Sequence, residues 1–251
     1  MLAHGASYNP GMRQEVASLL LRINLEFYQT FAGPFVDKRA RLQPGVLRAI
    51  EDLPMDAQVL ELGCGHAPLA AHLLRRGFHG RYVGLDHSQA LLDRRAAAAR
   101  PPTYEFFQAD LADPGWPERI AALAGPFEQV LAFAVLHHLP TEELRLAVLT
   151  EIRRLLLPSG SLALSVWDFL TSTRMRRRIV PWSQVGLSAD DVDPADFLLD
   201  WRHGGKGLRY VHHFSVEELR SLAQAAGFKV VSQFHADGSL GLYQVWESRR
   251  R

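Results

Sequence analysis

Three acidic residues follow three successive apolar segments in the first half of the chain. Glu61 lies just before a glycine turn at Gly63 and Gly65, Asp86 ends the next apolar segment, and Asp110 follows the third. If these segments are parallel strands, their carboxyl ends meet at one edge of a sheet, where nucleoside-containing cofactors bind. The two glycines can adopt backbone angles closed to other residues and let a ligand approach the main chain. The spacing therefore predicts a cofactor site at that edge.

The same residues distinguish between two cofactor classes. A dinucleotide would bring its pyrophosphate close to the Glu61 carboxylate, and its fingerprint ends in Gly or Ala where this chain has Pro68, which suits a helix start. S-adenosylmethionine instead carries an ammonium and a sulfonium, which an acid attracts. Asp86 is placed to accept hydrogen bonds from a ribose diol, and Asp110 could receive the adenine amino group. The alternative interpretation is that the sheet is an ordinary one and that these acids are incidental charged residues of its loops.

We therefore predict S-adenosylmethionine as the cofactor. The residues expected to contact it lie in the turn and at the strand ends: Glu61, Gly63, Cys64, Gly65, Asp86, His87, Asp110, Leu111 and Phe133.

Composition narrows the classes of protein to which the chain could belong. The 251 residues are 47% hydrophobic, enough for one substantial core or for a domain with an inserted cap. The net charge of +1 neither requires nor excludes nucleic acid. Cys64 is the one cysteine, so no intramolecular disulfide can form; we expect it to pack in the turn and the protein to be cytoplasmic. The sequence shows no signal-peptide pattern, membrane-length apolar run or metal-ligand spacing, so we expect no membrane or metal partner.

Apolar periodicity predicts an α/β fold with a doubly wound, Rossmann-like sheet. Strands are predicted at 58–62, 82–86, 104–108, 129–133, 161–166, 229–234 and 242–247, and helices at 44–53, 69–76, 89–99, 117–123, 142–157 and 216–226. The last two strands would form an antiparallel hairpin on an otherwise parallel, seven-stranded sheet. We divide the chain into a helical N-terminal extension, 1–55, and a main domain, 56–251, with a cap inserted at about 168–208.

The chain resembles a known family. The E-L-G-C-G turn, Asp86 and Asp110 resemble class I S-adenosylmethionine-dependent methyltransferases over residues 57–247, although Ala67 stands where that family usually has a third glycine. Further segments are similar to the tRNA wobble-uridine methyltransferases, which methylate the carboxylate of a 5-carboxymethyluridine. They are V-L-H-H-L-P-T-E-E-L-R at 135–145, V-P-W at 180–182, R-Y-V-H-H-F-S-V-E-E-L at 209–219, and Phe27-Tyr28 in the extension.

This narrower resemblance implies residues that hold the methyl acceptor. It matches the family's arginine–tyrosine pair to Arg209 and Tyr210, its next histidine to His212 and its tryptophan to Trp182. A carboxylate is already ionised at neutral pH and needs no base, so we expect Arg209 to clamp it, with single hydrogen bonds from Tyr210 and His212 and stacking on Trp182. Arg209 and Tyr210 could equally be a structural ion pair and a core aromatic residue.

His137 and His138 follow the fourth predicted strand. His137 is a candidate base for a hydroxyl or amine acceptor, although such a pair can also simply shape its loop. Trp167 and Asp168 end the fifth predicted strand and should face the same crevice, but we assign them no chemistry.

Other positions leave the substrate open. The family's N-terminal tryptophan is missing near Gln43-Pro44, and its C-terminal Asn-Trp motif is replaced at 235–243. The basic run at 174–178 in the cap, with Lys38, Arg39, Arg41 and 249–251, could contact tRNA phosphates or simply be solvated. The extension could also dock a small activating protein. The alternatives are a small-molecule carboxyl or hydroxyl methyltransferase and a non-catalytic, cofactor-binding subunit.

Overall fold

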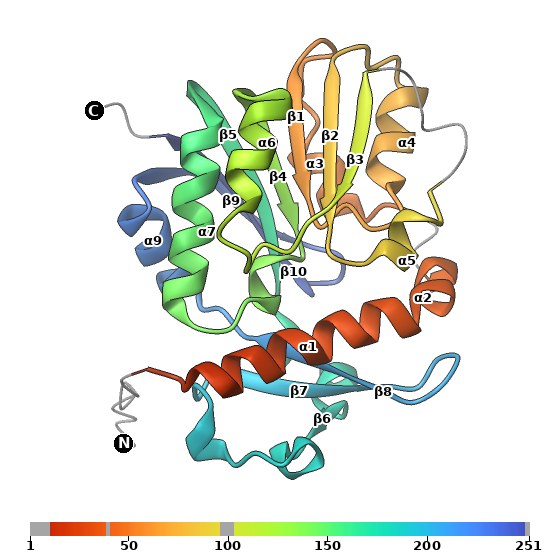
Figure 1. Cartoon of the computed structure of the whole chain (residues 1–251), viewed down its shortest axis with the longest axis vertical. Coiled ribbons are helices and arrows are strands. Elements are labelled where there is room, and N and C mark those ends of the chain that lie inside the picture. Colours follow the sequence, from red (N-terminus) through yellow and green to blue (C-terminus); the bar gives the residue numbers. More distant parts are fainter. Residues whose placement is uncertain (1–10, 39–40, 96–102, 249–251) are drawn as a thin grey trace.

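The structure, a computed structural model, describes residues 11–38, 41–95 and 103–248. Its main sheet has the order β3-β2-β1-β4-β5-β10-β9 (Figure 1). The first five strands in this order are parallel, while β10 is antiparallel to both β5 and β9. The strands are β1 (Gln58–Leu62), β2 (Arg81–Asp86), β3 (Tyr104–Gln108), β4 (Phe127–Phe133), β5 (Leu156–Trp167), β9 (Phe228–Ala236) and β10 (Gly241–Ser248). The predicted sheet, with its antiparallel C-terminal hairpin, is confirmed.

Helices cover both faces of this sheet, as the continuous burial of its central strands requires. One apolar cluster joins the sheet to α6, α7 and α9, and a second joins the opposite face to α3 and α4. These helices are α3 (Pro44–Ala49), α4 (Pro68–Arg75), α6 (Trp116–Ala124), α7 (Glu142–Leu155) and α9 (Val216–Ala225). The arrangement places the loops that follow β1, β2, β3 and β4 along one edge.

The helix predicted at 89–99 is wrong in part. α5 (Gln89–Leu92) is capped by Ser88, whose side chain accepts the Leu91 N–H, but the chain turns after Leu92. The Arg94 guanidinium donates to the Ala90 carbonyl and satisfies one of the acceptors that the helix end leaves open. Residues 96–99 of the predicted helix lie outside the described residues.

A second layer covers the loop edge of the sheet (Figure 1). Its small antiparallel sheet has the order β6-β7-β8, with β6 (Ile179–Val180), β7 (Asp196–Trp201) and β8 (Gly207–His212). The cap region also contains α8 (Thr173–Arg176) and the 3-10 helices η2 (Phe169–Thr171), η3 (Trp182–Val185) and η4 (Ala189–Asp191); η1 (Leu136–His138) follows β4. The ordered strands run to His212, beyond the predicted end of the cap at about 208.

The first two helices of the N-terminal extension belong to this layer. α1 (Gln14–Thr30) lies between the main sheet and the small sheet, packing on β8 and α5, and α2 (Ala32–Lys38) follows it (Figure 1). The buried Asn24 amide fixes α1 to β8: its oxygen accepts the Tyr210 N–H at 2.9 Å and its nitrogen donates to the Tyr210 carbonyl at 3.1 Å. Since the amide completes both backbone hydrogen bonds of Tyr210, it sets the position of the neighbouring Arg209.

Candidate active site

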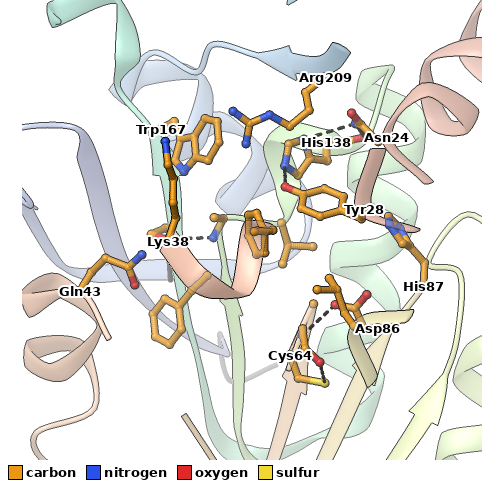
Figure 2. Close-up of a pocket in the computed structure, with 18 of the residues that line it drawn as sticks. Asn24, Tyr28, Lys38, Gln43, Cys64, Asp86, His87, His138, Trp167 and Arg209 are labelled. Atoms are coloured by element: carbon orange, nitrogen blue, oxygen red, sulfur yellow. Dashed lines mark hydrogen bonds between the residues drawn. The ribbon is translucent and has the colours of Figure 1, made fainter. Parts of the chain in front are cut away.

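A cavity of about 1040 Å³ lies between the loop edge of the main sheet and the second layer. All nine residues predicted to contact the cofactor line it, and so does Arg209. Figure 2 shows Cys64 and Asp86 at one end and Arg209 and Trp167 at the other, with Tyr28 and His138 between them. We refer to these ends as the cofactor half and the acceptor half, after the ligands that the sequence predicts for them.

The glycine turn at the start of the cofactor half has the backbone that its sequence suggested. Gly63 and Gly65 have φ angles of 67° and 56°, in the left-handed region that favours glycine. A Cβ on Gly63 would come within 2.6 Å of Val135 Cγ2, whereas one on Gly65 would project into open space at the cavity wall. A ligand can therefore approach the main chain at Gly65. Ala67 shares the left-handed conformation, with φ 57°.

Asp86 joins this turn to the end of β2. Its Oδ2 accepts the Gly65 N–H and its Oδ1 accepts the Ser88 N–H, both at 2.8 Å. Burial raises the pKa of Asp86, while these two hydrogen bonds act in the opposite direction. Each carboxylate oxygen can accept a further hydrogen bond, which is the chemistry that a ribose diol requires.

Glu61 is buried beside Asp86 and accepts a hydrogen bond from the Tyr82 hydroxyl. Burial raises its pKa to about 7; the Tyr82 hydrogen bond opposes this rise and the Asp86 charge adds to it. A cation placed beside Glu61 would favour its ionised form. The two carboxyl groups therefore fit a ligand that carries an ammonium group.

The remaining residues of the cofactor half differ in exposure. Asp110 is exposed, and its Oδ1 accepts the Ala112 N–H at 2.9 Å. The His87 ring lies 5.7 Å from the Tyr28 ring, so the extension closes over this end of the cavity. The Cys64 thiol is buried and burial raises its pKa, as expected for a packing residue.

In the acceptor half, Arg209 is surrounded by aromatic rings. The residue is 5% exposed, and its Cζ lies 4.9 Å from the ring centroids of Phe27 and Trp167 and 5.2 Å from that of Trp201. Such cation–π contacts hold a guanidinium in place. Because α1, β5, β7 and β8 each supply one member, the arrangement forms only in the folded chain.

Tyr28 and His138 form a hydrogen-bonded pair between the two halves (Figure 2). His138 Nδ1 lies 2.9 Å from the Tyr210 carbonyl oxygen, which can only accept, so Nδ1 carries the proton. Nε2 then accepts the Tyr28 hydroxyl proton over 2.9 Å. Both ring nitrogens are engaged, which fixes the ring in the wall of the cavity.

Four residues predicted as catalytic do not line the cavity: Tyr210, His212, Trp182 and His137. Successive side chains of a strand point to opposite faces, so Tyr210 and His212 point away from the side of β8 that Arg209 uses. The Tyr210 hydroxyl donates to Asp196 at 2.8 Å, and Tyr210 is thus the core aromatic residue of the alternative interpretation. These positions do not support direct contact with an acceptor.

His212 links the cap to the main domain. Its Nδ1 lies 2.7 Å from Asp196 and its Nε2 lies 2.9 Å from Glu218 in α9. Burial alone would lower the pKa of His212, but these two hydrogen bonds raise it above its ordinary value. The residue is a structural brace between two acids.

Trp182 and His137 also pack elsewhere. Trp182 packs against a separate apolar cluster that contains Val16 and Val192. His137 is fully buried with its ring 4.4 Å from that of His138, and it is His138 that lines the cavity. Trp167 does face the crevice, as expected, and packs on Arg209.

Comparison with known proteins identifies the family. Residues 35–233 match the model of a methyltransferase domain. The chain belongs to this family. It is a class I S-adenosylmethionine-dependent methyltransferase, and S-adenosylmethionine is its cofactor.

Its curated relatives include enzymes with different acceptors. The chain is 34% identical over 165 residues to a trans-aconitate 2-methyltransferase of Azoarcus, covering 64% of this chain and 59% of that protein. It is 30% identical over 158 residues to the tRNA (carboxymethyluridine(34)-5-O)-methyltransferase ALKBH8 of Macaca fascicularis, covering 63% of this chain and 22% of that protein. The chain therefore spans less than two thirds of the length of either relative.

Solved structures share the fold. A Burkholderia thailandensis 1,6-didemethyltoxoflavin-N1-methyltransferase with bound S-adenosylhomocysteine superposes with a TM-score of 0.63 at 19% identity, covering 97% of this chain and 93% of that one. A complex of the Haloferax volcanii Trm112 methyltransferase activator with a methyltransferase gives 0.60 at 16% identity, covering 90% and 98%.

In the part of the chain that the structure describes, no helix has the length and apolarity to cross a membrane. No group of three or more His, Cys, Asp or Glu side chains there could hold a metal ion.

Proposed function

We propose that this methyltransferase esterifies a carboxylate. The observation that carries the proposal is Arg209, a buried guanidinium held among three aromatic rings in the wall of the cavity that contains the glycine turn. A guanidinium binds a carboxylate through two parallel N–H···O bonds, which would orient its oxygens. The acceptor half has the chemistry to hold an anion, just as the cofactor half has the chemistry to hold a cation.

The residues of this chain need only bind the cofactor and the acceptor, orient them and exclude water. When bound, S-adenosylmethionine would supply an electrophilic methyl group, and an ionised carboxylate would accept it without losing a proton. The O–C bond would form as the S–C bond breaks, so no general base would be required. His138 agrees with this chemistry, because its Nε2 lone pair is already occupied by the Tyr28 hydroxyl.

We further propose that the nine residues of the cofactor half hold S-adenosylmethionine. Glu61 would bind its ammonium and Asp86 its ribose diol, while Gly65 leaves room for close approach to the main chain. Asp110 and Leu111 would border the adenine, and His87 and Phe133 would complete the wall.

For the acceptor, we propose the carboxymethyl group of a modified wobble uridine in tRNA. The resemblance at 135–145 and 209–219 supports it, as does the ALKBH8 relative. Arg174 and Arg178, from the basic run of the cap, line the cavity and could contact phosphates at its mouth. Of the other basic positions considered for this role, Arg39 and 249–251 lie outside the described residues.

A second candidate is a small carboxylic acid. The trans-aconitate enzyme is the relative that supports it, and trans-aconitate also carries carboxylates. Both candidates place a carboxylate on Arg209, and they differ in what surrounds it. An activator like the Trm112 partner of the Haloferax methyltransferase could dock on this fold, and we include one in the test.

A labelled-methyl assay tests the proposal. Purified protein, alone and with a Trm112-type activator, is given tRNA that carries 5-carboxymethyluridine or a panel of small carboxylic acids. Label that mild alkali releases as methanol is the expected result, because esters hydrolyse and N-methyl groups do not. Alkali-stable label would contradict carboxylate chemistry. Cofactor binding without transfer to any acceptor would instead favour a non-catalytic subunit.

If tRNA is the acceptor, its binding should weaken steeply as salt rises, because phosphate contacts release counterions. A flat salt response would remove the basic residues of the cap from the proposal.

A further inference from the structure

The acceptor half contains more positive charge than one carboxylate requires. Besides Arg209, four basic residues from α2 and the cap line the cavity: Lys38, Arg174, Arg178 and Arg202. They come from three segments of the chain, because Arg174 and Arg178 belong to the same basic run, and the fold brings these segments to one cavity.

Lys38 and Arg209 share one aromatic residue. The Lys38 ammonium lies 5.2 Å from the centroid of the Trp201 ring, and Arg209 Cζ lies at the same distance from that ring. The separation between Lys38 Nζ and Arg209 Cζ therefore cannot exceed the sum of these two distances. One small molecule can span such a separation with two anionic groups.

Nearby acids do not balance this charge. Asp200 is shared by two arginines: Arg178 lies 3.3 Å from its Oδ1, and Arg202 contacts its Oδ2. Asp237, which also lines the cavity, accepts hydrogen bonds from the Tyr243 hydroxyl and the Gly45 N–H. Among the described residues, no carboxylate forms an ion pair with Lys38 or Arg174. A carboxylate bound to Arg209 would still leave excess positive charge in the half-enclosed cavity, which a further anion would stabilise.

We propose that the methyl acceptor carries a second anionic group, a carboxylate or a phosphate, that binds at Lys38 with help from Arg174 and Arg178. This inference rests on the proposed function, because it takes Arg209 as the site of the reacting carboxylate. The second anion fixes the distance and direction of that carboxylate, and so the acceptor is selected by the spacing of its charges. A nucleotide and a small polycarboxylic acid both satisfy this requirement.

The chain offers a matched pair of variants. Lys38 is exposed on α2, and Lys38→Met removes its charge with little change of shape. Lys206 is also exposed and lies in the connection between β7 and β8, but it does not line the cavity. Lys206→Met therefore makes the same change in net charge outside the site, and Lys38→Arg restores the charge within it.

The first experiment measures binding by calorimetry in the presence of S-adenosylhomocysteine. The probes are tricarballylate and uridine 5′-monophosphate. Lys38→Met should weaken the better-binding probe about tenfold, and Lys206→Met less than about twofold. Equal affinities in wild type and Lys38→Met, or no binding of either probe to wild type, would overturn the inference.

The second experiment identifies the source of the anion by methyl transfer. One series compares 5-carboxymethyluridine with its 5′-monophosphate, and the other compares tricarballylate with butyrate. In wild type, the second anion should raise kcat/KM about tenfold or more in one series, and Lys38→Met should remove most of that gain. A gain in the first series identifies a nucleotide phosphate, and a gain in the second identifies a further carboxylate. Equal kcat/KM within both series would contradict the inference.

The two proposals can fail separately. Absence of methyl ester in every arm would contradict carboxylate methylation. The calorimetric comparison of Lys38→Met with Lys206→Met would still show whether an anion binds at Lys38. Ester formation with no preference for charge would leave Arg209 in its role and remove Lys38 from the site.

Discussion

The two halves of the cavity differ in charge and in construction. The cofactor half presents Glu61 and Asp86 beside a glycine turn, with contacts made largely by backbone N–H groups. The acceptor half presents basic side chains among aromatic rings, brought together from segments far apart in the sequence. One end therefore suits a cation and the other an anion, so the charge of each ligand specifies where it binds. Variants that change one half should leave the binding of the other ligand intact.

The largest expected effect is at Arg209. Arg209→Met should reduce kcat/KM for methyl transfer by a factor on the order of 10³, because a buried bidentate partner of the acceptor is lost. The affinity for S-adenosylhomocysteine, measured by calorimetry, should change less than about twofold. Arg209→Lys keeps the charge but cannot form two parallel hydrogen bonds to a carboxylate, so its activity should be intermediate. Loss of cofactor affinity in Arg209→Met would show that the two halves are not independent.

Asp86→Asn is the corresponding change in the cofactor half. The amide can accept only through one atom, so it cannot serve the Gly65 and Ser88 N–H groups and a ribose diol as the carboxylate can. We expect the dissociation constant for S-adenosylhomocysteine to rise about 30-fold. At saturating cofactor, KM for the acceptor should stay within about threefold of wild type. An unchanged cofactor affinity would remove Asp86 from the proposed site.

Glu61 should make cofactor binding depend on pH. Its pKa is raised to about 7 by burial, so the carboxyl is mostly neutral below that pH and mostly ionised above it. Since the ionised form attracts the cofactor's ammonium, the association constant for S-adenosylhomocysteine should rise about tenfold between pH 6 and pH 8. Glu61→Gln should bind more weakly at pH 8 and lose this dependence. A wild-type profile that is flat or falls with pH would contradict the role of Glu61.

The smallest effect is expected at Ala67. Its φ of 57° is costly for alanine and free of strain for glycine, but its buried methyl also contributes to packing. Ala67→Gly should therefore stabilise the protein by about 0.5 kcal/mol, measured as an increase in the free energy of unfolding by urea. Cofactor affinity should not change. A clear destabilisation would show that packing at Ala67 outweighs its backbone strain.

The family resemblance predicts Arg209, Tyr210 and His212 together in the acceptor pocket, but of these three only Arg209 lines the cavity. All three are polar residues within one strand, so the sequence contains no apolar alternation to indicate which face meets the cavity. That choice depends on α1, whose Asn24 binds the backbone of Tyr210 from 186 residues away. The same packing brings Tyr28, His138 and Trp201 to the cavity, and no local pattern marks these residues as partners.

By itself, the sequence determined the doubly wound sheet and the cofactor half. Gly63, Gly65 and Asp86 belong to strand ends and turns whose conformation follows from nearby residues, and parallel strands necessarily bring those ends together. Only the tertiary structure decided the acceptor half. Phe27, Trp167, Trp201 and Arg209 meet because the extension and the cap pack over the sheet edge, and that packing depends on long-range contacts that the order of residues does not reveal.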